Sequence, residues 1–340
     1  MLGLKVEKKD AQNAKEELVA RGALARGFKA FGKGNFVFFP LVEKTEVRAK
    51  HSFVEKNFAQ TLKPPSLKEL VRKIYPKMRD GEVFSSYDLI GDIALLEIPR
   101  KFLKKRKEIA RALLLSNKRI NTVLRKVGKR KGKYRLLKHE WLAGQKKLVT
   151  THKESGCLMK VNVAKAFFNS KMGTQRSRIA AKAEKGERVL VLFAGVGPFA
   201  LVIAKKKNAL VKAVEINPIA VKLMKENVLL NKLQGQIEVF QGDVKHYLTQ
   251  LGPWADRIIM PLAVGGEKYL GKVVENARKG TTIHYFSTGN EREGIYSKAL
   301  KQIEAVCKPK KRKFAVLEKS KGWPYAPRVF VVVIDFKLLN

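Results

Sequence analysis

The chain has 340 residues, of which 45% are hydrophobic, so it is long enough for two or three domains with cores of their own. Lys and Arg number 71 against 30 Asp and Glu, a formal charge of +41, and self-repulsion of that size indicates nucleic acid as the habitual partner. No apolar run approaches the roughly 18 residues of a membrane span, Cys157 and Cys307 form no CxxC motif, and the five histidines lack metal-ligand spacing. With no signal-peptide pattern at the N-terminus either, we expect a cytoplasmic protein without a disulfide framework, membrane segment or metal.

The sequence of residues 1–60 predicts a small α+β module followed by a linker. A helix is expected after Asp10 and a strand at residues 35–42, which contain three phenylalanines. Such aromatic side chains either stack on exposed bases or form plain core. A module of this size is expected to dock or bind, and Lys63-Pro64-Pro65 marks the linker that follows it.

Residues 61–165 predict a basic α+β RNA-binding domain. An amphipathic helix is expected from about residue 66, a buried strand within residues 87–99, and two short strands at 148–152 and 158–163. Residues 118–135 contain nine cations in eighteen positions, which predicts a phosphate-contacting loop, with a solvated hairpin tip as the alternative. The RNA contacts expected in this stretch are Arg125, Lys129, Arg130, Lys131 and Lys133.

Residues 166–340 predict the domain that binds a cofactor. An apolar run at 189–193 enters a turn with Gly195 and Gly197 and leaves as a helix, the arrangement by which a doubly wound α/β sheet brings bare backbone to a nucleotide-like ligand. With Ala200, these glycines also satisfy a loosened dinucleotide fingerprint. A nicotinamide dehydrogenase is therefore an alternative to a methyltransferase on this turn alone.

The strands that follow favour the methyltransferase. A strand at 210–215 ends in Glu215, about twenty residues after the first glycine, where a carboxylate accepts ribose hydroxyls. A third strand precedes Asp243, which suits an adenine amino group. Two further strands and an antiparallel hairpin, expected at 314–318 and 329–336 around a 324–328 loop, complete the sheet. The predicted fold is an α/β class I methyltransferase sheet, mostly parallel with an antiparallel terminal hairpin, preceded by two smaller α+β domains.

Seven motifs spread along the chain carry a family resemblance. They lie at 86–94 (SYDLIGDIA), 152–154 with 165–168, 172–176 (MGTQR), 193–199 (FAGVGPF), 215–218 (EINP), 283–285 (IHY) and 325–328 (YAPR). With these motifs the whole chain resembles the archaeal and eukaryotic tRNA (guanine-37-N1)-methyltransferases, a three-domain family, and the 193–199 string is specific to this group and its wyosine-pathway relatives.

The resemblance implies S-adenosylmethionine as cofactor and guanosine 37, the base 3′ to the anticodon, as target. It also implies that the N-terminal module touches the outer corner of the tRNA, and we expect a monomer that binds the anticodon stem-loop as well. Arg328, in the last motif, is assigned to RNA. The residues expected to bind the cofactor are Phe167, Phe193, Gly195, Gly197, Pro198, Glu215 and Asp243.

The chemistry requires a base near N1 of guanine, which carries a proton, and a cation or donor near O6, where charge gathers. By resemblance Arg135 stabilises O6, with simple phosphate contact as the alternative. The carboxylate base of the family falls on Gln175, an amide that cannot accept the proton, and its guanine-holding Asn falls on Pro261. Val191 replaces the acid usual at the end of the first strand. We therefore expect a guanosine-37 methyltransferase with an altered catalytic site; the alternatives are a wyosine-pathway enzyme (carbon methylation or aminocarboxypropyl transfer at position 37) and a non-catalytic tRNA-binding homologue.

Overall fold

The computed structural model describes residues 1–25, 27–60, 65–84 and 86–340, with the side chains of Asp80, Lys129 and Lys131 outside that description. The chain divides into two compact units, Met1–Ser66 and Leu67–Asn340. In the part of the chain that is described, no helix is long and apolar enough to cross a membrane. Lys63 and Pro64 of the expected linker lie outside the described residues.

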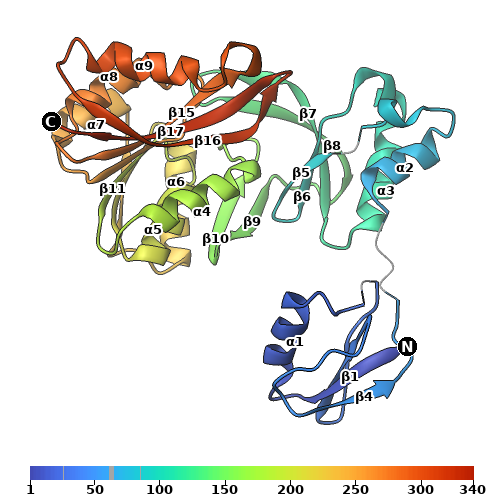
Figure 1. Cartoon of the computed structure of the whole chain (residues 1–340). Helices are drawn as coiled ribbons and strands as arrows, with labels where there is room; N and C mark the ends of the chain where they lie inside the picture. Colours follow the sequence, from blue (N-terminus) through green and yellow to red (C-terminus); the bar gives the residue numbers. More distant parts are fainter. Residues whose placement is uncertain (26, 61–64, 85) are drawn as a thin grey trace. The chain divides into compact units, whose positions relative to one another are not determined.

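The first unit is a four-stranded antiparallel sheet with one helix packed on it (Figure 1). Its elements are β1 (Leu2–Glu7), α1 (Ala11–Ala20), β2 (Phe31–Lys33), β3 (Phe36–Pro40) and β4 (His51–Glu55), in the sheet order β2-β3-β1-β4. The helix after Asp10 and the aromatic strand are both present. Leu4, Leu18 and Phe39 are buried together, so this part of the aromatic strand is core.

The second unit begins with a smaller sheet covered by two helices. Its elements are α2 (Leu67–Ile74), η1 (Asp80–Glu82), β5 (Tyr87–Ile90), β6 (Ile93–Leu96), η2 (Arg100–Lys105), α3 (Arg106–Ser116), β7 (Thr122–Lys131) and β8 (Leu136–Gly144), and the sheet order is β5-β6-β7-β8. One face of this sheet packs on α2 and α3 around Phe102, Ile109 and Leu113, all buried. The other face contributes Leu95 and Leu124 to the core of the large sheet, and part of it lines a cavity.

The cationic stretch at 118–135 is not a loop, contrary to the sequence prediction. Its backbone pairs with β6 on one side and β8 on the other, so it forms strand β7 and the turn of a hairpin. Val123 and Leu124 are buried, and these two apolar residues anchor the strand although cations surround it. Arg125 and Lys126 therefore lie on a paired strand and not on a loop.

The large sheet has seven strands in the order β13-β12-β11-β14-β15-β17-β16. The first five are parallel, and β17 runs antiparallel to both β15 and β16, as the sequence predicted. The strands and helices of this part are β9 (Val149–Glu154), β10 (Cys157–Asn162), η3 (Ser170–Met172), α4 (Gly173–Lys182), β11 (Arg188–Leu192), α5 (Pro198–Lys207), β12 (Leu210–Glu215), α6 (Pro218–Leu230), β13 (Ile237–Gln241), α7 (Val244–Leu251), β14 (Arg257–Met260), α8 (Glu267–Glu275), β15 (Thr282–Asn290), η4 (Glu291–Glu293), α9 (Ser297–Cys307), β16 (Phe314–Ala326) and β17 (Val329–Leu338).

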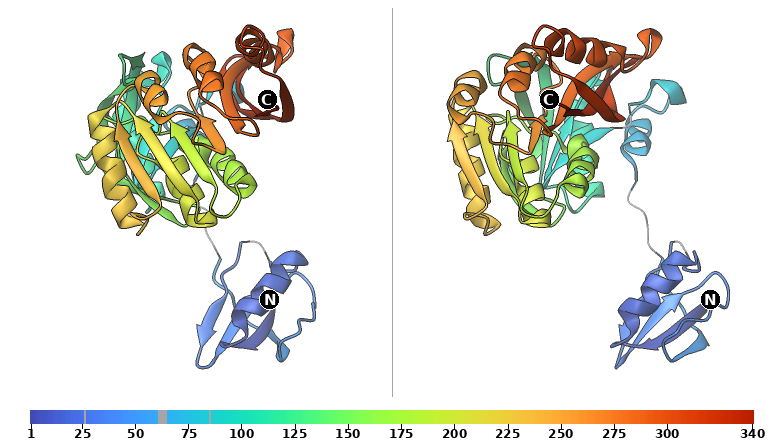
Figure 2. Two further views of the ribbon diagram at one scale, coloured as in Figure 1. Left: turned by 90° about the vertical axis from the view of Figure 1, so that its left-hand side faces the viewer. Right: turned by 60° about the vertical axis from the view of Figure 1, so that its left-hand side comes forward.

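Both faces of this sheet are covered by helices (Figures 1 and 2). Val189 and Val191 of β11 point to the core shared with α4, α5 and α6, and the alternate Leu190 and Leu192 point to the core shared with α7, α8 and α9. A central parallel strand is apolar on both faces for this reason. One predicted boundary was wrong, since β16 extends to Ala326 and so includes part of the expected 324–328 loop. Helix α4 begins at Gly173, inside the 172–176 motif.

Candidate active site

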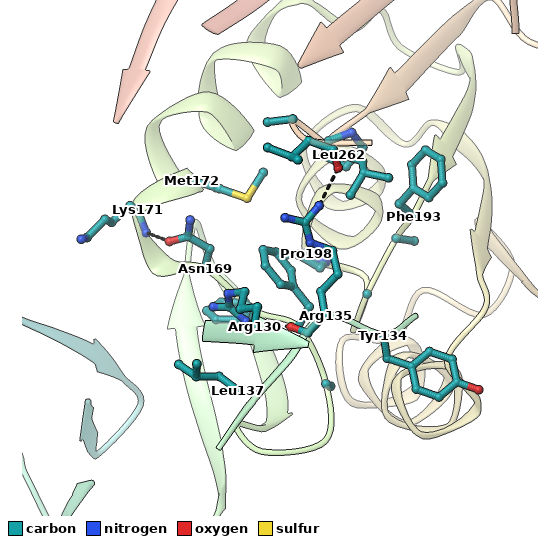
Figure 3. Close-up of a pocket in the computed structure, with 18 of the residues that line it drawn as sticks. Arg130, Tyr134, Arg135, Leu137, Asn169, Lys171, Met172, Phe193, Pro198 and Leu262 are labelled. Atoms are coloured by element: carbon teal, nitrogen blue, oxygen red, sulfur yellow. Dashed lines mark hydrogen bonds between the residues drawn. The ribbon is translucent and has the colours of Figure 1, made fainter. Parts of the chain in front are cut away.

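A cavity of about 450 Å³ lies between the turns that follow the central parallel strands and the open face of the β5–β8 sheet (Figure 3). Residues from the first part of the second unit and from the large sheet line it together. Because the carboxyl ends of parallel strands at the point where strand order reverses are the usual ligand site of such sheets, this cavity is the candidate active site.

The glycine-rich turn after β11 builds one wall. Gly195 and Gly197 both have positive φ, +59° and +88°, and a Cβ on Gly197 would lie 2.8 Å from Cγ of Met224, so only glycine fits there without a shift. The Gly195 amide donates to Oε2 of Glu215 (2.8 Å), and the Asn217 amide donates to Oε1 (2.8 Å). The turn thus holds the Glu215 carboxylate at the cavity wall, where burial raises the pKa of that carboxyl.

The third strand supplies a second acid to the same wall. Asp243 caps α7, its Oδ1 accepting from the Lys245 amide (2.8 Å), and it lines the cavity. Phe193 and Pro198 of the glycine turn and Phe167 line it too, whereas Gly197 shapes the turn without lining the cavity. Two carboxylates beside a bare backbone turn suit an adenosyl group, one acid for the ribose hydroxyls and one for the adenine amino group.

The β7–β8 hairpin brings cations to the opposite side of this cavity. Arg135 Nη1 donates to the backbone oxygen of Val264, in the loop after β14, over 2.5 Å (Figure 3). Arg130 lies over the ring of Phe167, 4.6 Å from its centroid. Arg135 and the glycine turn come from segments that the sequence assigned to different domains, and they line one cavity.

The sheet wall carries further charged groups. Asp88 accepts from Lys126 Nζ (2.5 Å) and pairs with Lys171 Nζ (3.2 Å). Burial raises the pKa of Asp88, but the hydrogen bonds and charges of these two lysines more than offset it, so the pKa lies below its ordinary value. This carboxylate is therefore ionised and already engaged.

His139, which pairs across the hairpin with Lys126, also lines the cavity. Burial and the neighbouring charges of Arg130 and Lys126 lower its pKa to about 4, so its imidazole is neutral at physiological pH. Its Nδ1 is buried and has no hydrogen-bond partner in the described part of the chain.

Of the three positions at which the sequence departs from the family pattern, Val191 is buried in the core, and the other two lie in different surroundings. Pro261 lines the cavity. Gln175 does not; it is buried on α4, where Nε2 donates to Ser320 Oγ (2.8 Å) and Oε1 accepts from Arg178 Nε (2.7 Å). Both ends of the amide are thus used to join α4 to the β16 strand and to Arg178.

Only some of the residues assigned to RNA contacts line the cavity. Arg130 and Lys133 line the cavity, whereas Arg125 and Arg328 do not. Arg125 Nε instead donates to Glu140 (2.6 Å). Lys129 and Lys131 have side chains outside the described set.

Sequence reasoning missed Asp88, Lys126, His139 and Lys171 as cavity residues. Asp88 pairs with Leu95 across β5 and β6, and Lys126 pairs with His139 across β7 and β8, so Asp88, Lys126 and His139 share one face of this sheet. Lys171 comes from η3 instead. A signal existed in the two-residue spacing of Asp88 and Ile90, but it becomes readable only once the 118–135 stretch is taken as a strand.

Comparison with known proteins identifies the family. Residues 150–317 match the model of the TRM5/TYW2 methyltransferase domain, residues 67–147 the TYW2 N-terminal domain and residues 3–49 the tRNA methyltransferase 5 N-terminal domain. The tRNA (guanine(37)-N(1))-methyltransferase Trm5b of Methanocaldococcus jannaschii is 33% identical, with 99% of this chain and 98% of that protein covered. The chain belongs to the tRNA (guanine-37-N1)-methyltransferase family.

Two further members of this family are similar over their full length. The Trm5b of Pyrococcus abyssi is 34% identical, with 99% of each chain covered. The solved complex of aTrm5 and tRNALeu is 31% identical and superposes with a TM-score of 0.71 over 100% of both chains. The family resemblance and the predicted fold class are therefore confirmed.

Proposed function

We propose that this protein transfers a methyl group from S-adenosylmethionine to N1 of guanosine 37 in tRNA. The observation that carries the proposal is that Arg135, on the β7–β8 hairpin, lines the same cavity as Glu215 and Asp243 at the ends of parallel strands. Membership of a methyltransferase family supports the reaction type. The chain has 71 basic and 30 acidic residues, and this excess of positive charge supports a polyanionic substrate.

The cofactor side of the cavity fits S-adenosylmethionine. Glu215 would accept hydrogen bonds from the ribose hydroxyls, because each of its oxygens keeps a lone pair beyond the bond to the turn. Asp243 would accept from the adenine amino group, and Gly195, Pro198, Phe193 and Phe167 would surround the adenosyl and methionine parts. The bound cofactor supplies the electrophilic methyl; the protein supplies its position and excludes water.

The target side requires donors for the guanine edge. Arg135 would donate to O6 as N1 loses its proton, exchanging the Val264 oxygen for that of the base. Gln175 does not take the proton, because it is an amide engaged at both ends by Ser320 and Arg178. The proton therefore passes to water or to another group at the cavity, and the catalytic site differs from the family pattern at this step.

The test is methyl transfer to unmodified tRNA carrying G37, compared with the same tRNA carrying A37. We expect labelled methyl on the G37 transcript alone, and nuclease digestion followed by mass spectrometry to show one methyl at N1 of residue 37. Equal incorporation into both transcripts would contradict the proposal.

A second candidate is modification of a wyosine precursor at position 37, which Gln175 and Pro261 favour because carbon chemistry needs a different proton acceptor. The mass of the product separates the two, since methyl and aminocarboxypropyl groups differ plainly. Tight, salt-sensitive tRNA binding without any labelled product would instead indicate a non-catalytic homologue.

The remaining assignments extend the proposal to the whole chain. The Met1–Ser66 unit would contact the outer corner of the tRNA and the Leu67–Asn340 unit the anticodon stem-loop, within a cytoplasmic monomer. The three-domain division at residues 60 and 165 stays a prediction.

A further inference from the structure

Two tyrosines are exposed where hairpins border the cavity. Tyr134, in the turn of the β7–β8 hairpin, has 36% of its surface exposed, and Tyr325, near the end of β16, has 54% exposed. Both line the cavity. Large aromatic surfaces left open at the edge of a binding cavity mark a place where a ligand packs.

Tyr134 lies in a tight turn of the β7–β8 hairpin. Residues 132–135 connect the paired Lys131 and Leu136, and the turn closes with the Arg135 amide donating to the Gly132 oxygen (3.0 Å). Arg135 has a positive φ of 53° and its side chain bonds the Val264 oxygen, while the neighbouring Tyr134 ring lines the cavity with part of its surface exposed. Figure 3 shows the Tyr134 ring directed away from the Arg135 guanidinium.

Tyr325 lies in a β-bulge of β16. Pro324 pairs with Phe330 and Ala326 with Val329, so two steps on β16 oppose one step on β17, and Tyr325 is the extra residue. Bulges re-aim a side chain in this way and occur beside active sites. The two rings thus come from different hairpins that border one cavity.

Basic residues close to both tyrosines in the sequence indicate what kind of partner binds there. Lys133 and Arg135 flank Tyr134 in the sequence, and Arg328 lies three residues after Tyr325, on the same hairpin. Exposed rings between cations are the arrangement with which proteins hold single-stranded nucleic acid, stacking bases on the rings and phosphates on the cations.

We propose, on the basis of the function proposed above, that Tyr134 and Tyr325 stack the two bases that flank the target nucleotide. A base that enters an enclosed cavity leaves the stack, and its two neighbours each lose one partner. One ring from each hairpin replaces those partners. The two rings then supply affinity for the opened anticodon loop, and the guanine itself is recognised inside the cavity.

The experiment uses the full chain and two tRNA transcripts with 2-aminopurine at position 36 or 38, beside G37. Tyr134→Leu and Tyr325→Leu remove one ring each, and Tyr134→Phe and Tyr325→Phe keep the ring without its hydroxyl. Trp141→Leu is the matched control, since Trp141 is an aromatic residue 42% exposed on β8 that does not line the cavity.

We expect each Leu variant to raise the Kd for tRNA about tenfold and to restore fluorescence at one flanking position only. The Phe variants and Trp141→Leu should bind and quench as the wild type does. Unchanged affinity for S-adenosylmethionine, measured by calorimetry, shows that the Leu variants are folded.

Leu variants that bind tRNA and quench both probes as the wild type does would overturn the inference. So would a lower rate at saturating tRNA with unchanged Kd and quenching, because the rings would then act on the target base. Failure of the proposed function appears separately, as a wild-type protein that stacks both probes but forms no N1-methylguanosine.

Discussion

Arg176 has no exposed surface, and its buried charge is paired with the carboxylate of Glu154. Its Nε and Nη2 each donate to one Glu154 oxygen over 2.6 Å, a bidentate pair. Glu154→Gln would leave this charge buried without its partner, so we expect a loss of about 3–5 kcal/mol in the free energy of unfolding, measured in urea at pH 7. Glu226→Gln, at an exposed pair with Lys160, is the control and should cost less than about 1 kcal/mol.

The same pair gives a pH dependence. Burial raises the pKa of Glu154, but Arg176 and His152 lower it further, to about 2 from a value of 4.5. Because the folded pKa is the lower one, this stability of about 3 kcal/mol is complete above pH 4.5 and is lost as the pH falls through 2. The difference between wild type and Glu154→Gln should therefore shrink between pH 4.5 and pH 2. A constant difference over that range would mean that the carboxylate charge is not what matters.

Gln175 offers a test of the altered catalytic site. In Gln175→Glu the new carboxylate can still accept from Arg178 and from the Ser320 hydroxyl, so the fold should tolerate it. Because the side chain does not line the cavity, we expect the single-turnover rate of methyl transfer to stay within about twofold of wild type. A rise of roughly 10²-fold would show instead that this position reaches the guanine when tRNA is bound.

Arg135 distinguishes O6 stabilisation from phosphate contact. If it donates to O6, Arg135→Ala should lower the single-turnover rate at saturating tRNA by roughly 10²–10³-fold, with unchanged affinity for S-adenosylmethionine. Arg135→Lys keeps the charge but not the planar fork, and should recover only part of the rate. A simple phosphate contact would raise the Kd for tRNA and leave the saturated rate unchanged.

Among the elements, the glycine-rich turn after β11 is constrained at Gly197. Gly197→Ala forces a side chain into positive φ and against Met224, so we expect it to destabilise the fold by about 2 kcal/mol or more and to weaken cofactor binding. Unfolding in urea and calorimetry with S-adenosylmethionine measure the two effects. Gly235→Ala, where no atom lies within 4 Å of the added Cβ and φ is not positive, should match the wild type; equal stability of both variants would contradict this account.

The sequence predicts the large sheet well, because each parallel strand is an apolar run followed by a recognisable turn. Glu215 and Asp243 could be placed on one edge for that reason. The β7–β8 hairpin could not be predicted so well, since cations outnumber its two buried apolar residues, Val123 and Leu124. Its strand state depends on pairing with β6, which is distant in the sequence. Its contact with Val264 depends on how two sheets meet, which no local pattern encodes. The family motif placed Gln175 at the position of the catalytic base. Its two hydrogen bonds go to Ser320 and Arg178, which lie outside that motif.

At the scale of the whole molecule, the charge of +41 predicts a strong salt dependence. If about 6–10 phosphates are contacted, affinity for tRNA should fall by roughly 10³–10⁵ between 50 and 200 mM salt, because each contact releases condensed counterions. Filter binding over this range measures the slope. Affinity for S-adenosylmethionine should change little over the same range; a shallow slope for tRNA would mean that few cations reach the phosphates.

The position of β17 sets an order for biosynthesis. It lies between β15 and β16, and β16 pairs with it although β16 comes first in the chain. During synthesis β16 is therefore made before the strand that pairs with it, and it can join the sheet only when β17 pairs with both β15 and β16. Frameshifts or stalls upstream of residue 329 would release a polypeptide whose β15 edge is open, a substrate for chaperones and proteases rather than a slower enzyme.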